Sequence, residues 1–410
     1  MNKVHVNWFA MAVLAAACAL LAMAPASAQK AYDPGASDTE IKIGNIMPYS
    51  GPLSSYSIVG KTEAAYFDKV NAEGGINGRK IKFVSYDDSS NPAKTVEQAR
   101  KLVEGDDVLL IFQSLGGSMN IAIEKYLNDR KVPQLFVAAN NKRFGDPKNF
   151  PWTMGWQPTA DNEGRIFAQY LLRNHPNAKV GVLYINVDVG KEYLAGLKGG
   201  LEGKVQVVAE VPYETTDPTV DSQVVTLKNS GADVVFLAAA PKPAVQAIRK
   251  MAELNWKPIR LLASISNSVG AVMKPAGMDI AKGILSVAFL KDPSSPLWKD
   301  DPAVKEWEVF MAAYYPEGDR TNTFTAYGYL LGQTMAQVLR QCGDNLTREN
   351  VMRQASSIKD LELGLLLPGI KINTSPIDYF PVKHMQMTLF NGESIELVGP
   401  LYNGAVATVD

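Results

Sequence analysis

Short apolar segments alternate with helix-like segments along most of this chain. The first series has strand candidates at 41–47, 80–86, 108–112 and 134–137. Segments of helical length lie between them at 59–72, 93–104 and 118–128, and the first two end at glycines. This regular alternation predicts a parallel sheet that is covered by helices on both faces.

A second series follows the Trp152–Pro158 segment, which is rich in aromatic residues and proline. Its strand candidates are 179–185, 205–211, 233–238, 259–264 and 283–289, and its helix candidates are 162–172, 190–201, 219–229 and 243–254. Two doubly wound, Rossmann-like α/β lobes fit two series better than one long sheet. Trp152–Pro158 is therefore predicted to be the first crossover between the lobes.

The tail must return to complete both lobes. It contains helix candidates near 302–315, 321–340 and 347–356 and a strand candidate at 384–390. With 410 residues and 46% apolar residues, the chain is long enough for two to three domains that each have a core.

The N-terminus has the pattern of a secretory signal peptide over residues 1–28. Lys3 precedes a long apolar run, and Ala26-Ser27-Ala28 forms a small-x-small cleavage site before a polar stretch. The alternatives are an uncleaved membrane anchor and lipidation of Cys18. We expect cleavage after about Ala28 and export to the periplasm.

Composition argues against several classes of function. Lys and Arg number 41 and Asp and Glu number 42, with no basic block, so nucleic acid is not an expected partner. Cys342 is the only cysteine of the mature chain, which excludes an internal disulfide. His175 and His384 are far apart and lie in no cluster of ligand spacing, so neither a metal site nor a catalytic triad is predicted, and we expect no cofactor.

Two nucleotide-binding motifs are incomplete. Gly60-Lys61-Thr62 resembles the end of a P-loop, but Ser55 stands where its first glycine is needed. The glycine-rich run at 196–203 has Lys198 at the first glycine of a dinucleotide fingerprint. A Rossmann-type enzyme is therefore disfavoured.

Open parallel sheets bind ligands outside the carboxyl ends of their strands. In the first lobe this edge comprises the loops 48–57, 87–91, 113–118 and 138–142. In the second lobe it comprises the loops 186–190, 212–218, 239–243 and 265–268. If these edges face each other, one ligand can lie between the lobes and be enclosed when they close.

Several stretches resemble a known family over essentially the whole mature chain. They are IKIGNIMPYSGPLSSYS, FDKVNAEGGINGRKIKFVSYDDSSNPAKTVEQARKLV, YLNDRKVPQLFV and VLYINVDVGKEYLAGLKGGL. They are similar to the leucine/isoleucine/valine-binding protein family, the type I periplasmic solute-binding proteins of ABC importers. The resemblance implies two lobes, three crossover segments, no catalysis, a monomer, and delivery of the ligand to an inner-membrane permease. It places lobe 1 at 29–157 and 289–375 and lobe 2 at 158–288 and 376–410.

The resemblance also implies ligand-binding positions. Tyr56 matches a position where the family places an aromatic ring over the ligand. Other positions depart from the family pattern: Gly117 replaces a serine, Asn140 a threonine, Val189 and Ala240 tyrosines, and Ile265 the glutamate that binds an α-ammonium group. Gly116 and Ser90 stand where the family has disulfide cysteines.

These departures favour a carboxylate over an amino acid. Gly116 and Gly117 leave backbone N–H groups free before a helix and Ser118 is a good N-cap, so an anion site remains. A buried ammonium would lack an acid partner, which costs several kcal/mol. We therefore expect a small hydrophobic or aromatic carboxylate. If Asp188, otherwise a surface turn residue, or an acid from the tail restores the cation site, branched-chain or other hydrophobic amino acids are expected instead. A ligand-sensing module for a membrane receptor is the alternative function.

Overall fold

The first series of strands forms a five-stranded parallel sheet with the order β3-β2-β4-β5-β6. The computed structural model describes residues 30–404. The strands of this sheet are β2 (Glu40–Met47), β3 (Lys80–Asp87), β4 (Leu110–Phe112), β5 (Gln134–Val137) and β6 (Thr153–Gly155). The connecting helices are α2 (Ser57–Ala72), α3 (Pro92–Arg100) and α4 (Gly117–Asp129). Gly60-Lys61-Thr62 lies inside α2.

The second series forms a seven-stranded sheet with the order β14-β13-β11-β10-β9-β7-β8. Its parallel strands are β7 (Lys179–Ile185), β8 (Gln206–Tyr213), β9 (Val234–Ala238), β10 (Ile259–Leu262) and β11 (Leu285–Ala288). The antiparallel hairpin of β13 (His384–Phe390) and β14 (Ile395–Asn403) extends its edge beside β11. The helices of this part are α5 (Ala160–Asn174), α6 (Asp188–Leu201), α7 (Asp221–Asn229), α8 (Pro241–Glu253), α9 (Lys274–Ala276) and α10 (Met278–Ala281).

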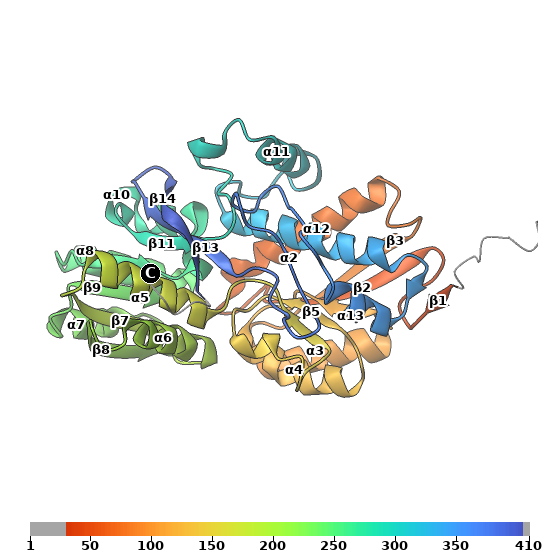
Figure 1. Cartoon of the computed structure of the whole chain (residues 1–410), viewed down its shortest axis with the longest axis horizontal. Coiled ribbons are helices and arrows are strands. Elements are labelled where there is room, and N and C mark those ends of the chain that lie inside the picture. Colours follow the sequence, from red (N-terminus) through yellow and green to blue (C-terminus); the bar gives the residue numbers. More distant parts are fainter. Residues whose placement is uncertain (1–29, 405–410) are drawn as a thin grey trace, which may run out of the picture.

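Between β11 and β13 the chain returns to the first sheet. This return contains α11 (Pro302–Tyr314), α12 (Thr323–Cys342), β12 (Asn345–Leu346) and α13 (Arg348–Ala355). Helix α12 packs against α2, while α11 projects at the top of the molecule (Figure 1). The predicted fold class, two doubly wound α/β lobes with crossover segments between them, is confirmed. The exact lobe boundaries stay a prediction.

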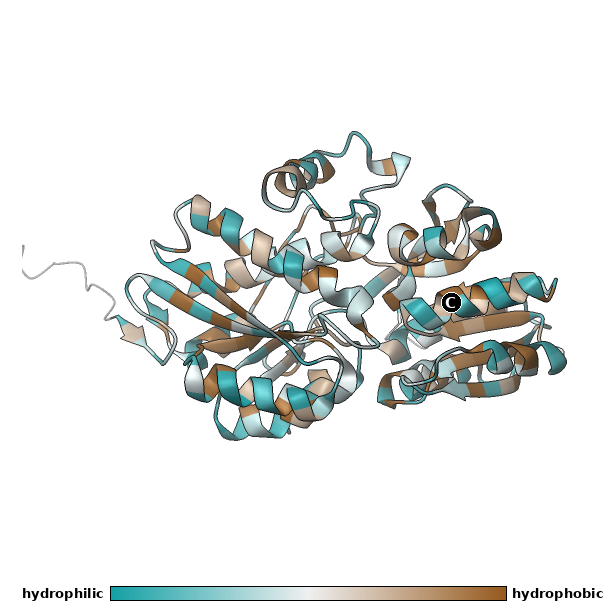
Figure 2. Cartoon of the chain, turned by 180° about the vertical axis from the view of Figure 1, so that it is seen from behind, coloured by the Kyte–Doolittle hydropathy of each residue, from teal (hydrophilic) through white to brown (hydrophobic). Residues whose placement is uncertain are grey.

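Burial explains why the central strands are so apolar. Every residue of β4, β5 and β9 is buried, as expected for strands of a parallel sheet that has helices on both faces. In Figure 2 the central strands of the second sheet are mostly brown, whereas the helices around them alternate between brown and teal. Such helices bury one stripe and expose the other.

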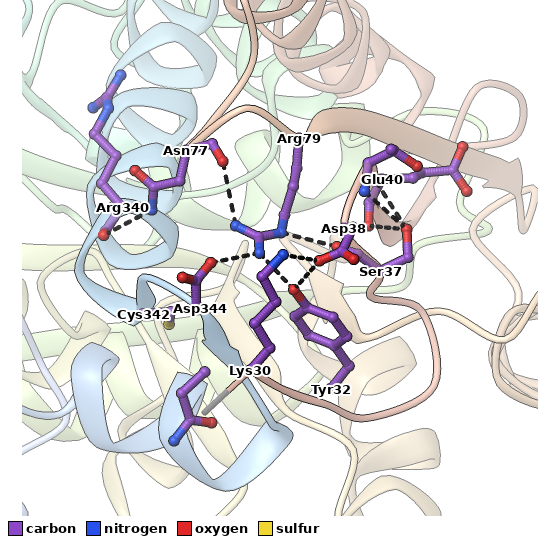
Figure 3. A network of polar contacts seen from close by, with 12 residues as sticks. Lys30, Tyr32, Ser37, Asp38, Glu40, Asn77, Arg79, Arg340, Cys342 and Asp344 are labelled. Carbon is purple, nitrogen blue, oxygen red and sulfur yellow. Dashed lines mark hydrogen bonds and ion pairs between the residues drawn. The ribbon is translucent and has the colours of Figure 1, made fainter. Parts of the chain in front are cut away.

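The glycine-rich run before β3 has an anchoring role in this chain. Arg79 ends the run and is only 2% exposed; its guanidinium donates to Ser37 O at 2.8 Å, Tyr32 OH at 2.6 Å and Asp344 Oδ1 at 2.6 Å (Figure 3). Tyr32 lies in β1 (Ala31–Tyr32), which pairs with β12. One buried arginine thus ties the start of the described chain and the tail to the first sheet.

The structure differs from the sequence prediction in several segments. Strand β6 occupies Thr153–Gly155, so three of the seven residues of the expected Trp152–Pro158 crossover belong to the sheet, and β14 was not predicted. The predicted signal peptide and Cys18 lie outside the described residues. Among residues 30–404, Cys342 is a buried free thiol, and no helix is long and apolar enough to cross a membrane.

The crossovers meet at Trp156, directly after β6. Its indole is fully buried and packs edge-on against Phe289, which follows β11, at 5.9 Å between ring centroids, and its Nε1 donates to Thr334 Oγ1 of α12 at 3.2 Å. Its carbonyl accepts from Val382 N, just before β13, at 3.3 Å. Through its side chain and its backbone carbonyl, Trp156 therefore contacts or bonds segments from all three connections between the two sheets.

We predict that Trp156→Ala lowers the free energy of unfolding by about 3 to 5 kcal/mol, because it leaves a large cavity where the crossovers meet. Urea denaturation followed by circular dichroism measures the loss. Trp152→Ala, which truncates a half-buried tryptophan of the same segment, is the matched control and should cost clearly less. Equal losses for the two variants would contradict a central role for Trp156.

Candidate ligand-binding site

A cavity of about 290 Å³ lies between the two sheets, at the carboxyl ends of their strands. It is lined from both sides, by loops that follow β4 and β5 in the first sheet and by loops that follow β7, β9 and β10 in the second. The predicted residues that line it are Tyr56, Gly117, Ser118, Asn140, Val189, Ala240 and Ile265. The structure therefore brings together all the predicted site residues except Asp188.

Tyr56 spans the cavity. It ends the short 3-10 turn Ser54–Tyr56 before α2, and its ring packs against Phe324 at 5.1 Å between centroids. Its hydroxyl donates to Ile265 O, in the loop after β10, at 3.0 Å. Tyr56 is thus both a wall of the cavity and a link between the two lobes.

The N-terminus of α4 opens into the cavity. The helix begins at Gly117, so Gly116 is the N-cap and Ser118 lies in the first turn, which corrects the expectation that Ser118 is the cap. Gly116 has φ 101°, a conformation that favours glycine, and provides no capping side chain. The first N–H groups of α4 consequently lack partners within the helix, and the helix dipole makes this end positive.

Two adjacent asparagines follow β5, and they differ in their partners. The Asn140 side chain, 3% exposed, donates to Tyr193 OH of α6 in the other lobe. The Asn141 side chain is 1% exposed, and neither of its amide atoms has a hydrogen-bond partner in the protein. The Glu192 carboxylate, which accepts from Lys142 N at 2.8 Å, lies close enough to the Asn141 amide that this amide opposes the rise that burial causes in the Glu192 pKa, but the contact lacks the geometry of a hydrogen bond.

Asn141 also explains the glycine at 117. A Cβ atom on Gly117 would lie 2.5 Å from Asn141 Oδ1, which is too close for any contact. The amide of Asn141 therefore occupies the space that a side chain at 117 would need, beside the first turn of α4. The family resemblance pointed to Asn140 at this edge but not to Asn141. Only the contact between Gly117 and Asn141 in the structure reveals the role of Asn141.

The wall from the second lobe is mostly apolar. Val189 and Ile265 are half-buried, and Ala240 is buried, with its N–H donating to Tyr213 OH at 3.0 Å. Asp188 is exposed and lies instead in a neighbouring open groove with Lys142, Arg143 and Glu192. It is the first residue of α6, and its side chain does not cap that helix.

Behind this wall lies a buried acid, Glu163 of α5. Its carboxylate accepts from Ser264 N and Ser264 Oγ, both at 2.6 Å, and from Tyr193 OH at 3.4 Å. Burial raises the pKa of the Glu163 carboxyl to about 7, although these hydrogen bonds oppose the rise. Because Tyr193 also accepts from Asn140, this polar chain reaches across to the first lobe.

The tail contributes residues that sequence patterns did not identify. Thr323, Phe324 and Tyr327 of α12 line the cavity, as does Asp292, four residues after the end of β11. Phe324 and Tyr327 are three residues apart and therefore share one face of the helix. Among residues 30–404, Asp292 is the only Asp, Glu, Lys, Arg or His that lines the cavity. The same residues contain no group of three or more side chains that could hold a metal ion.

The arrangement suits a ligand that is apolar apart from a few hydrogen-bonding groups. Unpaired N–H groups, the Ser118 hydroxyl and the Asn141 amide surround one end of the cavity, and none of the lining residues is cationic. Such donors bind a carboxylate without a salt bridge. The remaining walls are aliphatic and aromatic, which is typical of small-molecule sites.

Comparisons with known proteins identify the family of this chain. Residues 40–388 match a family described as periplasmic binding protein. The chain is 25% identical over 325 residues to Leu/Ile/Val-binding protein homolog 1 of Brucella abortus, covering 77% of this chain and 82% of the relative.

Solved structures show the same fold. A branched chain amino acid ABC transporter protein from Thermus thermophilus with bound valine has a TM-score of 0.81 and 16% identity, covering 90% of this chain and 97% of that one. A fatty acid ABC transporter substrate-binding protein from Thermomonospora curvata has a TM-score of 0.76 and 22% identity, covering 91% and 95%.

We predict that Glu163 makes the protein less stable as the pH rises. Its pKa is raised above the value near 4.5 of an unfolded glutamate, so between about pH 4.5 and about pH 7 the folded state binds more protons. The group therefore favours folding at low pH, and this contribution, at most about 3 kcal/mol, is lost towards pH 8.

Urea denaturation of Glu163→Gln at about pH 5 and about pH 8 tests the effect. The variant should show a smaller fall in unfolding free energy than the wild type, whereas Glu97→Gln, at an exposed position of α3, should match the wild type. An unchanged pH dependence in Glu163→Gln would disprove the assignment.

Proposed function

The chain belongs to the periplasmic binding protein family, and from that premise we propose that it is the substrate-binding protein of an ABC importer. It is exported to the periplasm and acts as a monomer. It captures a small carboxylate between its lobes and delivers it to a permease in the inner membrane. No catalytic step is part of this proposal.

The observation that carries the choice of ligand is the polar end of the cavity. The N-terminus of α4 and the buried, unpartnered amide of Asn141 meet there, in a site lined by no lysine, arginine or histidine. Unmade hydrogen bonds of this kind cost about 1 to 3 kcal/mol each, and a carboxylate oxygen can accept from both groups. Tyr56, Gly117, Ser118, Asn140, Val189, Ala240 and Ile265 form the proposed binding surface.

The rest of the ligand is hydrophobic or aromatic in this proposal. Position 265 is an isoleucine, so it provides no carboxylate for an α-ammonium group. Its backbone carbonyl already accepts a hydrogen bond from Tyr56 OH. Hydrophobic amino acids remain the second candidate, because Asp292 lines the same cavity and its carboxylate could pair with an α-ammonium group. The names of the relatives include both a Leu/Ile/Val-binding protein homolog and a fatty acid substrate-binding protein, so they do not decide between the two.

We predict that hydrophobic carboxylates raise the melting temperature more than the matching α-amino acids. A ligand at 100 times its dissociation constant adds about 2.7 kcal/mol, which is roughly 5 to 10 °C for lobes of this size. A thermal-shift panel should pair leucine with 4-methylpentanoate and phenylalanine with 3-phenylpropanoate. Shifts by the amino acids alone would reverse the choice, and no shift by either class would remove the proposed function.

We further predict that Asn141→Leu separates binding from stability. Loss of the amide should weaken carboxylate binding by about 1.5 to 3 kcal/mol, because a buried charge loses a hydrogen bond. Since the amide has no partner in the protein, the free energy of unfolding should stay equal or rise by about 1 kcal/mol.

Asn140→Leu is the matched comparison for this test. It should lower the free energy of unfolding because it removes the hydrogen bond to Tyr193. Titration calorimetry and urea denaturation of both variants give the four values needed. Wild-type affinity in Asn141→Leu would place the carboxylate elsewhere.

A further inference from the structure

The cavity extends beyond the space between the two sheets. Its lining includes Leu290 and Trp298 after β11, Leu367 between α13 and β13, and Ile395 and Leu397 of β14. Leu290 and Trp298 lie in the connection that follows β11, whereas Leu367, Ile395 and Leu397 lie outside the loops that a doubly wound sheet offers at its ligand-binding edge. They form a second arm of the cavity, which we call the hairpin arm.

Hydrogen bonds hold the walls of the hairpin arm in place. At its junction with the space between the lobes, Asn267 Nδ2 donates to Val287 O and to Thr388 Oγ1, both at 3.2 Å. Farther along, Ser295 Oγ donates to Ile395 O at 3.1 Å, and Leu367 N donates to Phe289 O at 3.0 Å. The arm is therefore a built part of the fold that shares walls with the carboxylate site.

Asp292 is the polar group of this arm, and half of its carboxylate has no partner. Oδ1 accepts from Ser294 N at 2.9 Å and from Ser294 Oγ at 2.7 Å. Oδ2 is buried and makes no hydrogen bond, and the residue is only 6% exposed. Burial raises the pKa of the Asp292 carboxyl, since desolvation disfavours the charged form.

The nearest cation in sequence does not neutralise Asp292. Lys291 Nζ donates to Asp301 Oδ2 at 2.6 Å and lies over the Trp298 ring, 5.1 Å from its centroid. A buried carboxylate oxygen without a donor costs free energy that a hydrogen bond from a ligand can offset. Asp292 thus has a free acceptor at the side of an otherwise apolar arm.

We propose that the hairpin arm holds the tail of an elongated carboxylate, whose head lies at the N-terminus of α4 and whose far end offers an O–H or N–H donor to Asp292. This proposal rests on the proposed function, because it takes the carboxylate site as the position of the head. It narrows the ligand class to amphipathic acids that are longer than an α-amino acid.

The first test uses the wild-type protein alone. Calorimetric titration with butanoate, hexanoate, octanoate and decanoate should show affinity rising by up to about fourfold per added methylene until the arm is full. Butanoate that binds as tightly as octanoate would overturn the arm but leave the proposed function intact. Binding by none of the acids would remove the proposed function itself.

A blocking variant locates the tail. Leu397→Trp should weaken octanoate at least about tenfold more than butanoate, because the larger ring fills the arm. Leu297→Trp makes the same change at a position that is 57% exposed and outside the cavity, and it should bind both acids like the wild type. Equal weakening of both acids in Leu397→Trp would overturn the placement of the tail.

The far end is tested with ω-hydroxyoctanoate and ω-aminooctanoate against octanoate. At least one of the two should bind the wild type about tenfold more tightly than octanoate, and the preferred one identifies the donor. Asp292→Leu should abolish that preference while it keeps or improves octanoate binding. If the wild type binds octanoate more tightly than both substituted acids, the proposed role of Asp292 is wrong.

Discussion

The burial of Trp156 where the crossovers meet is the constraint on which the two-lobed architecture depends. Its ring packs on Phe289, its Nε1 bonds α12, and its carbonyl bonds the segment before β13, so the connections form a packed core. Residues adjacent to these contacts line the cavity, including Gln157 and Phe289 itself. The junction that joins the lobes therefore also sets the floor of the binding site.

The buried polar groups in and around the cavity differ in whether they have hydrogen-bond partners. Glu163 is buried behind the cavity wall and accepts three hydrogen bonds, which makes it a structural group. The amide of Asn141 and Oδ2 of Asp292 are equally buried, but they lack partners and belong to residues that line the cavity. Native proteins rarely leave such groups unpaired, and among the unpaired buried side chains of residues 30–404 these two belong to residues that line the cavity, where a bound ligand could reach them.

The sequence predicted the parallel strands because short apolar runs that alternate with helical segments are distinctive. The edge rule for parallel sheets predicted the loops that contain Tyr56 and Gly117, and the family resemblance singled out these two residues. The sequence analysis missed β6 because three residues carry little pattern, and it missed β14 because most of that strand's residues are partly buried or exposed. Asn141, Phe324 and Asp292 could not be found from spacing. Their roles depend on tertiary contacts, such as the packing of Asn141 against Gly117, between segments far apart in the chain.

The contacts between lobes also limit what a ligand can contribute to closure. Tyr56 bonds Ile265 and Asn140 bonds Tyr193, so protein groups alone supply these links across the cavity. A ligand shifts an open–closed equilibrium only through interactions that differ between the two states. The groups left for it are the N-terminus of α4 and Asn141 on one side and the apolar loops after β7, β9 and β10 on the other. A carboxylate attached to an apolar body matches both sides at once, and that pairing, more than either contact alone, is what would favour the closed arrangement.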